Sequence, residues 1–223
     1  LIQGTIPANR SSFAVKGAIH HPDACFRAEL EKRLKGKGIT LDKQKIEDGE
    51  RHALLTTVSP FLKDIVYYTN KNSINLFAEA LGELISPTDY ARTVKVELSH
   101  IGIDSCGITL KDASGLSPAN AVPAEVFTDL LIWAKGHLSD AFVSSLPRGN
   151  VDWGLRVYSD HPVLRENVIA KTGSMSGVRA LAGYLKNQKG ETLAFTILVN
   201  NYVGDPVKVQ EIIRDLLKDI ADK

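Results

Sequence analysis

The sequence predicts an α/β (α+β) protein in which an antiparallel sheet is combined with helices. Residues 168–170, 180–185 and 192–199 are apolar stretches of strand length, bounded by turn-forming residues. The Asn-Gln-Lys-Gly stretch at 187–190 separates the last two and predicts a hairpin turn between them. Helical apolar spacing occurs on both sides of this region, so the chain mixes the two kinds of element.

The N-terminal region divides near residue 20. Residues 1–20 are strand-like but are broken by glycine and proline. Residues 22–35 place apolar side chains four positions apart and predict a helix, which Gly36 and Gly38 should end. The charge-dense stretch 42–51 that follows is typical of a solvated loop.

The middle of the chain is predicted to be mainly helical. Residues 61–69 and 76–85 both carry helical apolar spacing and predict packed helices. Residues 94–98 and 103–110 fit either strands or buried helix segments, and the sequence leaves both readings open. The Asp-Ala-Ser-Gly stretch at 112–115 predicts a turn.

Two further helices have clear start signals. Pro123 lies at the first turn of one, ahead of Val126 and Leu130. Asp205 and Pro206 open the other, which continues with apolar residues at helical spacing. These helices precede and follow the three predicted strands.

Composition excludes several classes of partner. Lysine plus arginine (27) nearly balances aspartate plus glutamate (26), so no basic excess favours nucleic acid or an anionic membrane surface. The longest apolar runs, such as 130–134, are far shorter than the roughly 20 residues that cross a bilayer, so no transmembrane segment is expected. The chain begins at Leu1 without a methionine or a signal peptide, and we expect residues upstream of it.

Cysteine and histidine patterns give no sign of a metal site. Cys25 and Cys106 are too few for a disulfide framework, and whether they pair is left open. The six histidines are scattered, without acidic residues at ligand spacing. We therefore expect no metal ligands.

Lys171, Thr172 and Gly173 form the most informative tripeptide. An ammonium and a hydroxyl side by side can hold a carboxylate, and glycine lets a ligand lie close to the backbone. The alternative is an exposed strand end followed by a turn glycine, and the tripeptide alone does not decide between the two.

Ser73 and Asn75 lie directly before the predicted helix 76–85. A hydroxyl and an amide at a helix entrance can point toward a ligand. Serine and asparagine also cap helices, by accepting hydrogen bonds from unpaired N–H groups, and capping is the commoner use. The triplet alone therefore favours a cap.

The order of these motifs changes that reading. Ser-x-Asn followed by Lys-Thr-Gly is typical of penicillin-binding proteins and class A β-lactamases. Most of the chain resembles the C-terminal half of the penicillin-binding D-alanyl-D-alanine carboxypeptidase and endopeptidase family, of the low-molecular-mass class C type. The blocks that carry the resemblance are 4–7, 73–81, 112–120 and 170–178. Two positions depart from the family pattern. Isoleucine stands at position 74, where the family commonly has aspartate, and residues 152–155 match the family's Gly-Thr-Leu stretch only loosely.

The resemblance implies a fold and a domain organisation. The fold would be β-lactamase/transpeptidase-like, with helices on both faces of the antiparallel sheet, and this chain would hold only part of that domain. Residues 1–20 would be the end of an inserted β-rich domain, and residues 21–223 the C-terminal part of the penicillin-binding domain.

The resemblance also implies roles for individual residues. Ser73 would relay a proton to the leaving amine, and Asn75 would hold the substrate's amide and a neighbouring lysine. Lys171 and Thr172 would receive the terminal carboxylate of a peptidoglycan stem peptide or a β-lactam. The remaining substrate-binding positions are Gly173 and Ser174, whose N–H would form half of an oxyanion hole. The loop carrying Asp112, Ser114 and Asn120 is interpreted as structural.

The nucleophile of such an enzyme is missing from the chain. No serine from Ser11 to Ser176 has a lysine three residues later. We therefore expect the Ser-x-x-Lys segment elsewhere in a longer protein, a serine-type D-Ala-D-Ala peptidase of the periplasm or cell envelope that needs no cofactor. Two alternatives remain: a non-catalytic module that binds peptidoglycan or β-lactams, and a β-lactamase or esterase on the same fold.

Overall fold

The computed structural model describes residues 8, 12, 14, 19–40, 53 and 55–223, with the Trp153 side chain left out. The chain divides into two compact units, Leu1–Thr57 and Val58–Lys223. In the first, α1 (Pro22–Gly36) confirms the predicted helix, and none of its residues is buried. Most of segment 1–20 and all of 42–51 lie outside the described residues, so the domain boundary near residue 20 stays a prediction.

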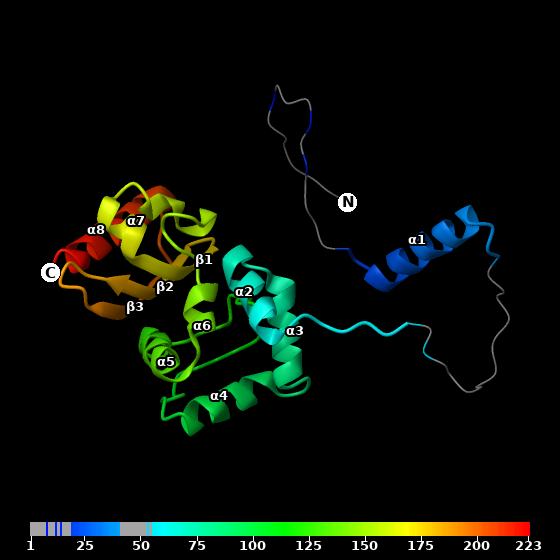
Figure 1. Ribbon diagram of the computed structural model, residues 1–223, viewed down its shortest axis with the longest axis horizontal. Coiled ribbons are helices and arrows are strands. Elements are labelled where there is room, and N and C mark those ends of the chain that lie inside the picture. Colours follow the sequence, from blue (N-terminus) through cyan, green and yellow to red (C-terminus); the bar gives the residue numbers. More distant parts are fainter. Residues whose placement is uncertain (1–7, 9–11, 13, 15–18, 41–52, 54) are drawn as a thin grey trace. The chain divides into compact units, whose positions relative to one another are not determined.

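An antiparallel sheet of β1 (Val168–Met175), β2 (Val178–Lys186) and β3 (Thr192–Asn200), in that order, forms one layer of the second unit (Figure 1). The three predicted strands and the hairpin are thereby confirmed. However, β1 continues to Met175, because residues 171–175 pair without interruption with β2. Lys171, Thr172 and Gly173 thus lie inside a strand and not at its end.

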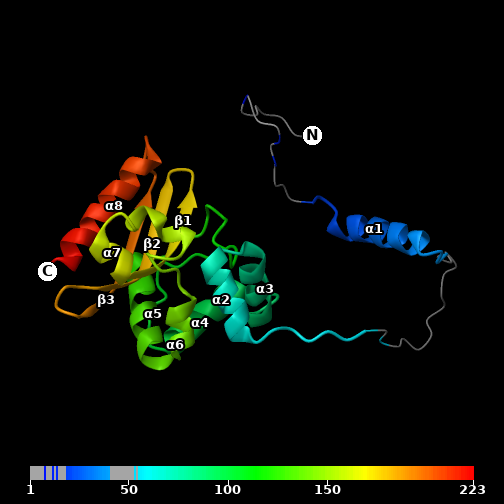
Figure 2. The same ribbon diagram turned by 45° about the horizontal axis from the view of Figure 1, so that its top comes forward.

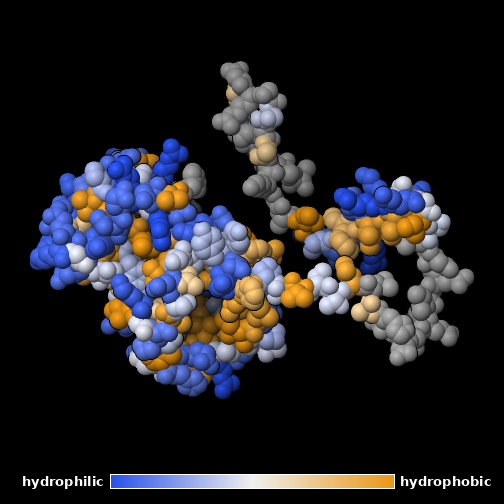
Figure 3. All heavy atoms as spheres, viewed as in Figure 1, coloured by the Kyte–Doolittle hydropathy of each residue, from blue (hydrophilic) through white to orange (hydrophobic). Residues whose placement is uncertain are grey.

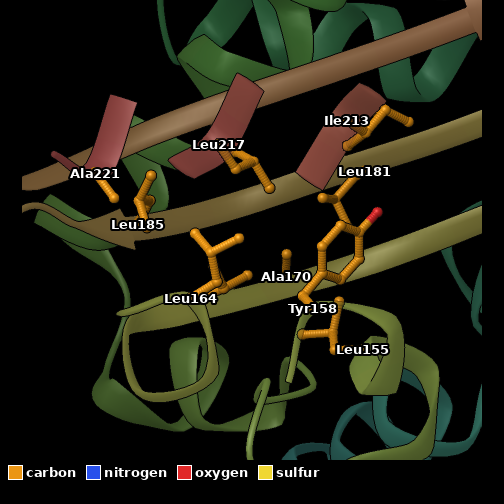
Figure 4. Close-up of a cluster of buried hydrophobic side chains, with 10 residues drawn as sticks. Leu155, Tyr158, Leu164, Ala170, Leu181, Leu185, Ile213, Leu217 and Ala221 are labelled. Carbon is orange, nitrogen blue, oxygen red and sulfur yellow. The ribbon is translucent and has the colours of Figure 1, made fainter. Parts of the chain in front are cut away.

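One face of the sheet is covered by α8 (Pro206–Ala221), α7 (Pro162–Asn167) and the short 3-10 helix η1 (Trp153–Tyr158) (Figure 2). The largest buried cluster lies here, and Figure 4 shows side chains of η1, α7 and α8 meeting those of β1 and β2. Leu217 of α8 and Leu181 of β2 are almost completely buried. Asp205 caps α8 by accepting a hydrogen bond from the Val207 N–H, as its sequence signal predicts.

The opposite face carries α5 (Ala124–His137) and α6 (Asp140–Ser145). Leu131 and Leu146 pack there against Tyr184, whose hydroxyl donates a 2.6 Å hydrogen bond to the Leu131 carbonyl. Helices therefore lie on both faces of the sheet, as expected.

The remaining helices are α2 (Leu62–Asn72), α3 (Asn75–Ile85) and α4 (Tyr90–His100). The first two confirm the predicted helices, and α4 settles 94–98 as helix. Residues 103–110 form neither a strand nor a helix: the segment turns at Cys106 and Gly107 and pairs only at Thr109, in an isolated bridge to Ala121. Its Ile103 and Ile108 are buried with Leu98 and Val126, so burial without sheet pairing explains the apolar pattern.

Part of the outer surface of α2 and α3 is apolar, and it appears orange in Figure 3. The exposed aliphatic residues of these two helices include Leu62, Leu76, Leu84 and Ile85. Residues 58–223 therefore do not bury the whole apolar surface of these two helices by themselves.

Candidate active site

Lys171 is the central residue of the candidate site. It lies on β1, and its Nζ donates a 2.9 Å hydrogen bond to Ser73 Oγ and a 2.8 Å hydrogen bond to the Thr172 carbonyl. Burial lowers the pKa of the Lys171 ammonium. An ammonium has three N–H donors, and these two bonds within the described chain leave one for a ligand.

Ser73 lies between α2 and α3 in a left-handed backbone conformation, with φ of 53°. The Ile74 N–H bonds to the Thr69 carbonyl, which closes the end of α2. The N-cap residue of α3 is Ile74, and no side chain caps that helix, so the capping alternative for Ser73 is wrong. A left-handed conformation costs a residue other than glycine about 1 kcal/mol, and such strain is typical of functional positions.

Asn75 is the first residue of α3 and is exposed. The structure brings Ser73 and Lys171 together although they are 98 residues apart, and Asn75 follows Ser73 by two residues at the start of α3. The roles assigned to these three residues stay predictions.

Gly173 and Ser174 continue the strand beyond Lys171. A side chain at Gly173 would place its Cβ 3.2 Å from Ala180 Cβ on β2, a closer approach than most such contacts. Thr172 lies beside η1, because a Cβ added at Gly154 would be 3.5 Å from Thr172 Oγ1. The 152–155 block, which matches its family pattern loosely, therefore lies against Thr172.

The outer edge of β1, on the side away from β2, differs between the first and second halves of the strand. At its start, the Ala170 N–H bonds outward to the Pro147 carbonyl, 2.9 Å away. Backbone N–H groups of a strand alternate direction at each residue, so those of Thr172 and Ser174 face the same edge. That edge has no strand partner within the described residues, because β1 ends the sheet. The Ser174 N–H thus faces this outer edge of β1, and its role in an oxyanion hole stays a prediction.

An ion pair next to Ser73 was not predicted from the sequence. Lys71 Nζ lies 2.9 Å from Asp152 Oδ2 and 2.6 Å from the Leu146 carbonyl oxygen. The Lys71 and Asp152 side chains are only 9% and 19% exposed. Asp152 also accepts a hydrogen bond from the Arg148 N–H. The two charges are 81 residues apart, so no local spacing could reveal the pair.

The loop after residue 110 is held by its own hydrogen bonds. Asp112 accepts bonds from the Gly115 and Ser117 N–H groups and from Asn120 Nδ2. Burial alone would raise the pKa of Asp112, but these bonds outweigh it and the pKa is lowered. Glu79 of α3 binds the Ser114 N–H from outside the loop. These contacts support the structural interpretation of Asp112, Ser114 and Asn120.

Other features of the described chain add no chemistry. No group of three His, Cys, Asp or Glu side chains there could hold a metal ion. Cys25 and Cys106 are free and exposed. Within the part of the chain that the structure describes, no helix has both the length and the apolar character needed to cross a membrane.

Solved structures with the same fold include penicillin-binding enzymes. Penicillin binding protein 4 (dacB) from Haemophilus influenzae, solved with a β-lactam, superimposes with a TM-score of 0.82 at 28% identity, over 95% of this chain and 54% of that one. The extended-spectrum β-lactamase TLA-1 gives a TM-score of 0.60 at 17% identity over 72% of this chain and 63% of that one, which supports the shared fold alone.

Two curated relatives are named as D-alanyl-D-alanine carboxypeptidases. A D-alanyl-D-alanine carboxypeptidase from an Actinomadura species is 30% identical over 99% of this chain and 45% of its own length. D-alanyl-D-alanine carboxypeptidase DacB from Haemophilus influenzae is 29% identical over 92% of this chain and 46% of its own length. The chain thus spans about half the length of these relatives. The model of the D-Ala-D-Ala carboxypeptidase 3 (S13) family matches residues 1–222, and the chain belongs to that family.

Proposed function

We propose that the protein containing this chain is a serine-type D-Ala-D-Ala carboxypeptidase or endopeptidase that acts on peptidoglycan stem peptides and is acylated by β-lactams. The observation that carries the proposal is the 2.9 Å hydrogen bond between Lys171 Nζ and Ser73 Oγ. It joins the two family motifs in space, and it joins an ammonium to a hydroxyl at the open edge of β1.

The reaction has two covalent steps. A serine hydroxyl in a Ser-x-x-Lys segment outside these 223 residues attacks the carbonyl carbon of the scissile amide. The C–N bond breaks, an acyl-serine ester forms, and the leaving amine takes up a proton. Water then hydrolyses the ester and restores the serine.

Ser73 and Lys171 move the proton in the first step. Ser73 Oγ donates its proton to the leaving amine and recovers one from the nucleophile's side, since a hydroxyl is both donor and acceptor. Lys171 holds the Ser73 hydroxyl in place through the bond to Oγ. Because burial lowers the pKa of Lys171, this ammonium also releases a proton more readily than an exposed lysine does.

The open half of β1 binds the substrate. Lys171 Nζ and Thr172 Oγ1 receive the terminal carboxylate, Gly173 lets the peptide lie against the strand, and the Ser174 N–H stabilises the oxyanion. The second oxyanion donor is the nucleophile's own N–H. Asn75 binds the substrate's amide from α3.

The substrate sets the location. Peptidoglycan lies outside the cytoplasmic membrane, so we propose a periplasmic or cell-envelope protein. The chemistry uses protein groups and water, so the proposed mechanism includes no cofactor step. The balanced charge of the chain gives no reason to expect nucleic acid as a partner.

Intact-mass spectrometry of the full-length protein, before and after benzylpenicillin, tests the proposal. We expect a single covalent adduct, and its loss in a Lys171→Ala variant, because carboxylate capture is lost. Lys186→Ala, which removes an exposed lysine from β2 of the same sheet, should keep the adduct. Acylation of Lys171→Ala at the normal rate would refute the role of Lys171.

Two other functions are separable by experiment. A non-catalytic module that binds wall peptides or β-lactams is suggested by the missing Ser-x-x-Lys, and that motif in the full-length sequence would exclude it. A β-lactamase or esterase is suggested by the shared fold. Turnover of a chromogenic cephalosporin without release of D-alanine from a stem peptide would favour this second function over the peptidase.

A further inference from the structure

The loop 146–152, between α6 and η1, is held at both ends by one side chain. Lys71 Nζ binds the Leu146 carbonyl at the start of the loop and the Asp152 carboxylate at its end. Asp152 also closes the loop on itself, by accepting a 2.7 Å hydrogen bond from the Arg148 N–H. The last turn of α2 thus fixes the loop's position.

The same loop is bonded to the first half of β1. The Ala170 N–H donates to the Pro147 carbonyl at 2.9 Å, and the Gly149 N–H donates to the Val168 carbonyl at 3.1 Å. A Cβ at Gly149 would lie 2.9 Å from the Leu164 carbonyl oxygen of α7, so the loop also fits closely against that helix. With β1 on one side and α7 close by, the loop has little room to shift.

Two connections therefore run in parallel between α2 and β1, which Figure 2 shows close together. Lys71 precedes Ser73 by two residues, and Ala170 is the neighbour of Lys171. The first connection runs from Lys71, which binds the Leu146 carbonyl, through the loop to Pro147, whose carbonyl accepts the Ala170 N–H. The second is the hydrogen bond between Ser73 and Lys171.

We propose that Lys71 and Asp152 are positioning residues, which hold Ser73 within hydrogen-bonding distance of Lys171. The inference rests on the proposed function and adds two residues to it. Neither residue touches the substrate in this account. Their ion pair sets the end of α2 against β1, and it is largely shielded from water, so solvent weakens it little.

A purely structural role is the rival explanation, and the chain contains a matched control for it. Asn70 Nδ2 donates a 2.7 Å hydrogen bond to the Oγ of Ser145, which is fully buried on α6. This contact anchors the same turn of α2, but neither of its side chains bonds to the 146–152 loop. Removing it should loosen α2 without cutting the connection to β1.

The test is stopped-flow acylation of the full-length protein by benzylpenicillin over a range of concentrations. The proteins compared are the wild type, Lys71→Met, Asp152→Asn, the double variant and Asn70→Ala. The limiting rate constant reports chemistry, and the half-saturating concentration reports binding. The amplitude counts folded protein, so partial unfolding lowers the amplitude and not the rate constant.

We expect Lys71→Met and Asp152→Asn each to lower the limiting rate constant at least tenfold and to change the half-saturating concentration less than threefold. Binding is kept because Lys171 stays on β1. The double variant should be no slower than the slower single variant, since Lys71→Met removes both bonds from Lys71 to the loop and Asp152→Asn weakens one of those same two bonds. Asn70→Ala should stay within twofold of the wild type.

Rate constants within twofold of the wild type for Asp152→Asn, which keeps the side chain's size, would overturn the inference even where Lys71→Met fails to fold. Equal slowing in Asn70→Ala would overturn it too. If the wild-type protein itself forms no acyl adduct, the proposed function fails, and this outcome is distinct from the other two.

Discussion

Gly183 on β2 should tolerate no side chain. A Cβ built there lies 2.5 Å from Ala170 Cα and closer still to the Ile169 carbonyl oxygen, both on β1. Carbon atoms in contact are normally about 3.5–4.0 Å apart. In a Gly183→Ala variant the two strands must therefore separate by about 1 Å at this point.

The cost can be worked out from the ladder between β1 and β2. Strand separation of about 1 Å weakens roughly two backbone hydrogen bonds, each worth about 1 kcal/mol. Overpacking adds about 1–3 kcal/mol. We expect Gly183→Ala to lower the free energy of unfolding by about 3–5 kcal/mol. It should also slow acylation, because Ala170, opposite Gly183, precedes Lys171.

Two other glycines provide a graded comparison. A Cβ at Gly173 would meet Ala180 Cβ at 3.2 Å, so Gly173→Ala should cost about 1 kcal/mol. A Cβ at Gly136, on α5, meets nothing within 4 Å, and Gly136→Ala should stabilise the helix by up to about 1 kcal/mol. Urea unfolding of the full-length proteins, followed by tryptophan fluorescence, measures all three. A Gly183→Ala variant within about 0.5 kcal/mol of the wild type would refute the steric reasoning.

Three further predictions concern charge and packing. Because burial lowers the pKa of Lys171, the second-order acylation constant should fall on the alkaline side earlier than for an exposed lysine, and Lys171→Arg should move that fall to higher pH. Burial raises the pKa of Tyr158 to about 12, so its ionisation is too alkaline to cause the fall. Leu217 is fully buried, so Leu217→Ala should lower the free energy of unfolding by about 2–5 kcal/mol. The neighbouring Leu216 is 46% exposed, so Leu216→Ala should lower it by less than about 1 kcal/mol. Urea unfolding measures both variants. Burial would raise the pKa of Asp112, but its hydrogen bonds outweigh burial and lower that pKa in the folded protein. The ionised Asp112 carboxylate therefore stabilises the fold at pH values above its unfolded pKa, and this stabilisation is lost as the pH falls through the folded pKa. In thermal unfolding, the wild type should be more stable than Asp112→Asn at neutral pH, and this difference should shrink below about pH 4.

Local pattern was enough to predict most elements but not how far they extend. The helices α1, α5 and α8, each with a proline at or just before its first residue, and the three strands follow from spacing and turn residues, whereas α7 also starts with proline and was not predicted. Residues 171–175 were not predicted as strand, because lysine, glycine and serine have no strand pattern, and only pairing with β2 extends β1 through them. The apolar stretch 103–110 shows the reverse, since its Ile103 and Ile108 are buried although the stretch pairs only in an isolated bridge.

The candidate site was predictable only in part for the same reason. Ser73 and Lys171 were found because each belongs to a short motif, and the order of the motifs indicated a common site. Lys71 and Asp152 carry no motif that pairs them, and a lysine in a helix is usually a solvated residue. Their contact depends on the loop 146–152 lying against β1, which is a property of tertiary packing and not of either sequence neighbourhood.

The two halves of β1 have opposite roles at its outer edge. An open strand edge invites unwanted pairing, and proteins cover such edges. Here the loop 146–152 occupies the edge beside residues 168–170, which fixes the strand in place. The edge beside residues 172–174 has no strand partner in the described chain, and its outward N–H and C=O groups can pair with an extended peptide. Its short length suits the proposed dipeptide terminus, because a segment of two residues needs only the outward groups of Thr172 and Ser174. Under the proposed function, the covered half supplies the rigidity with which the open half holds a scissile amide against Ser73 and Lys171.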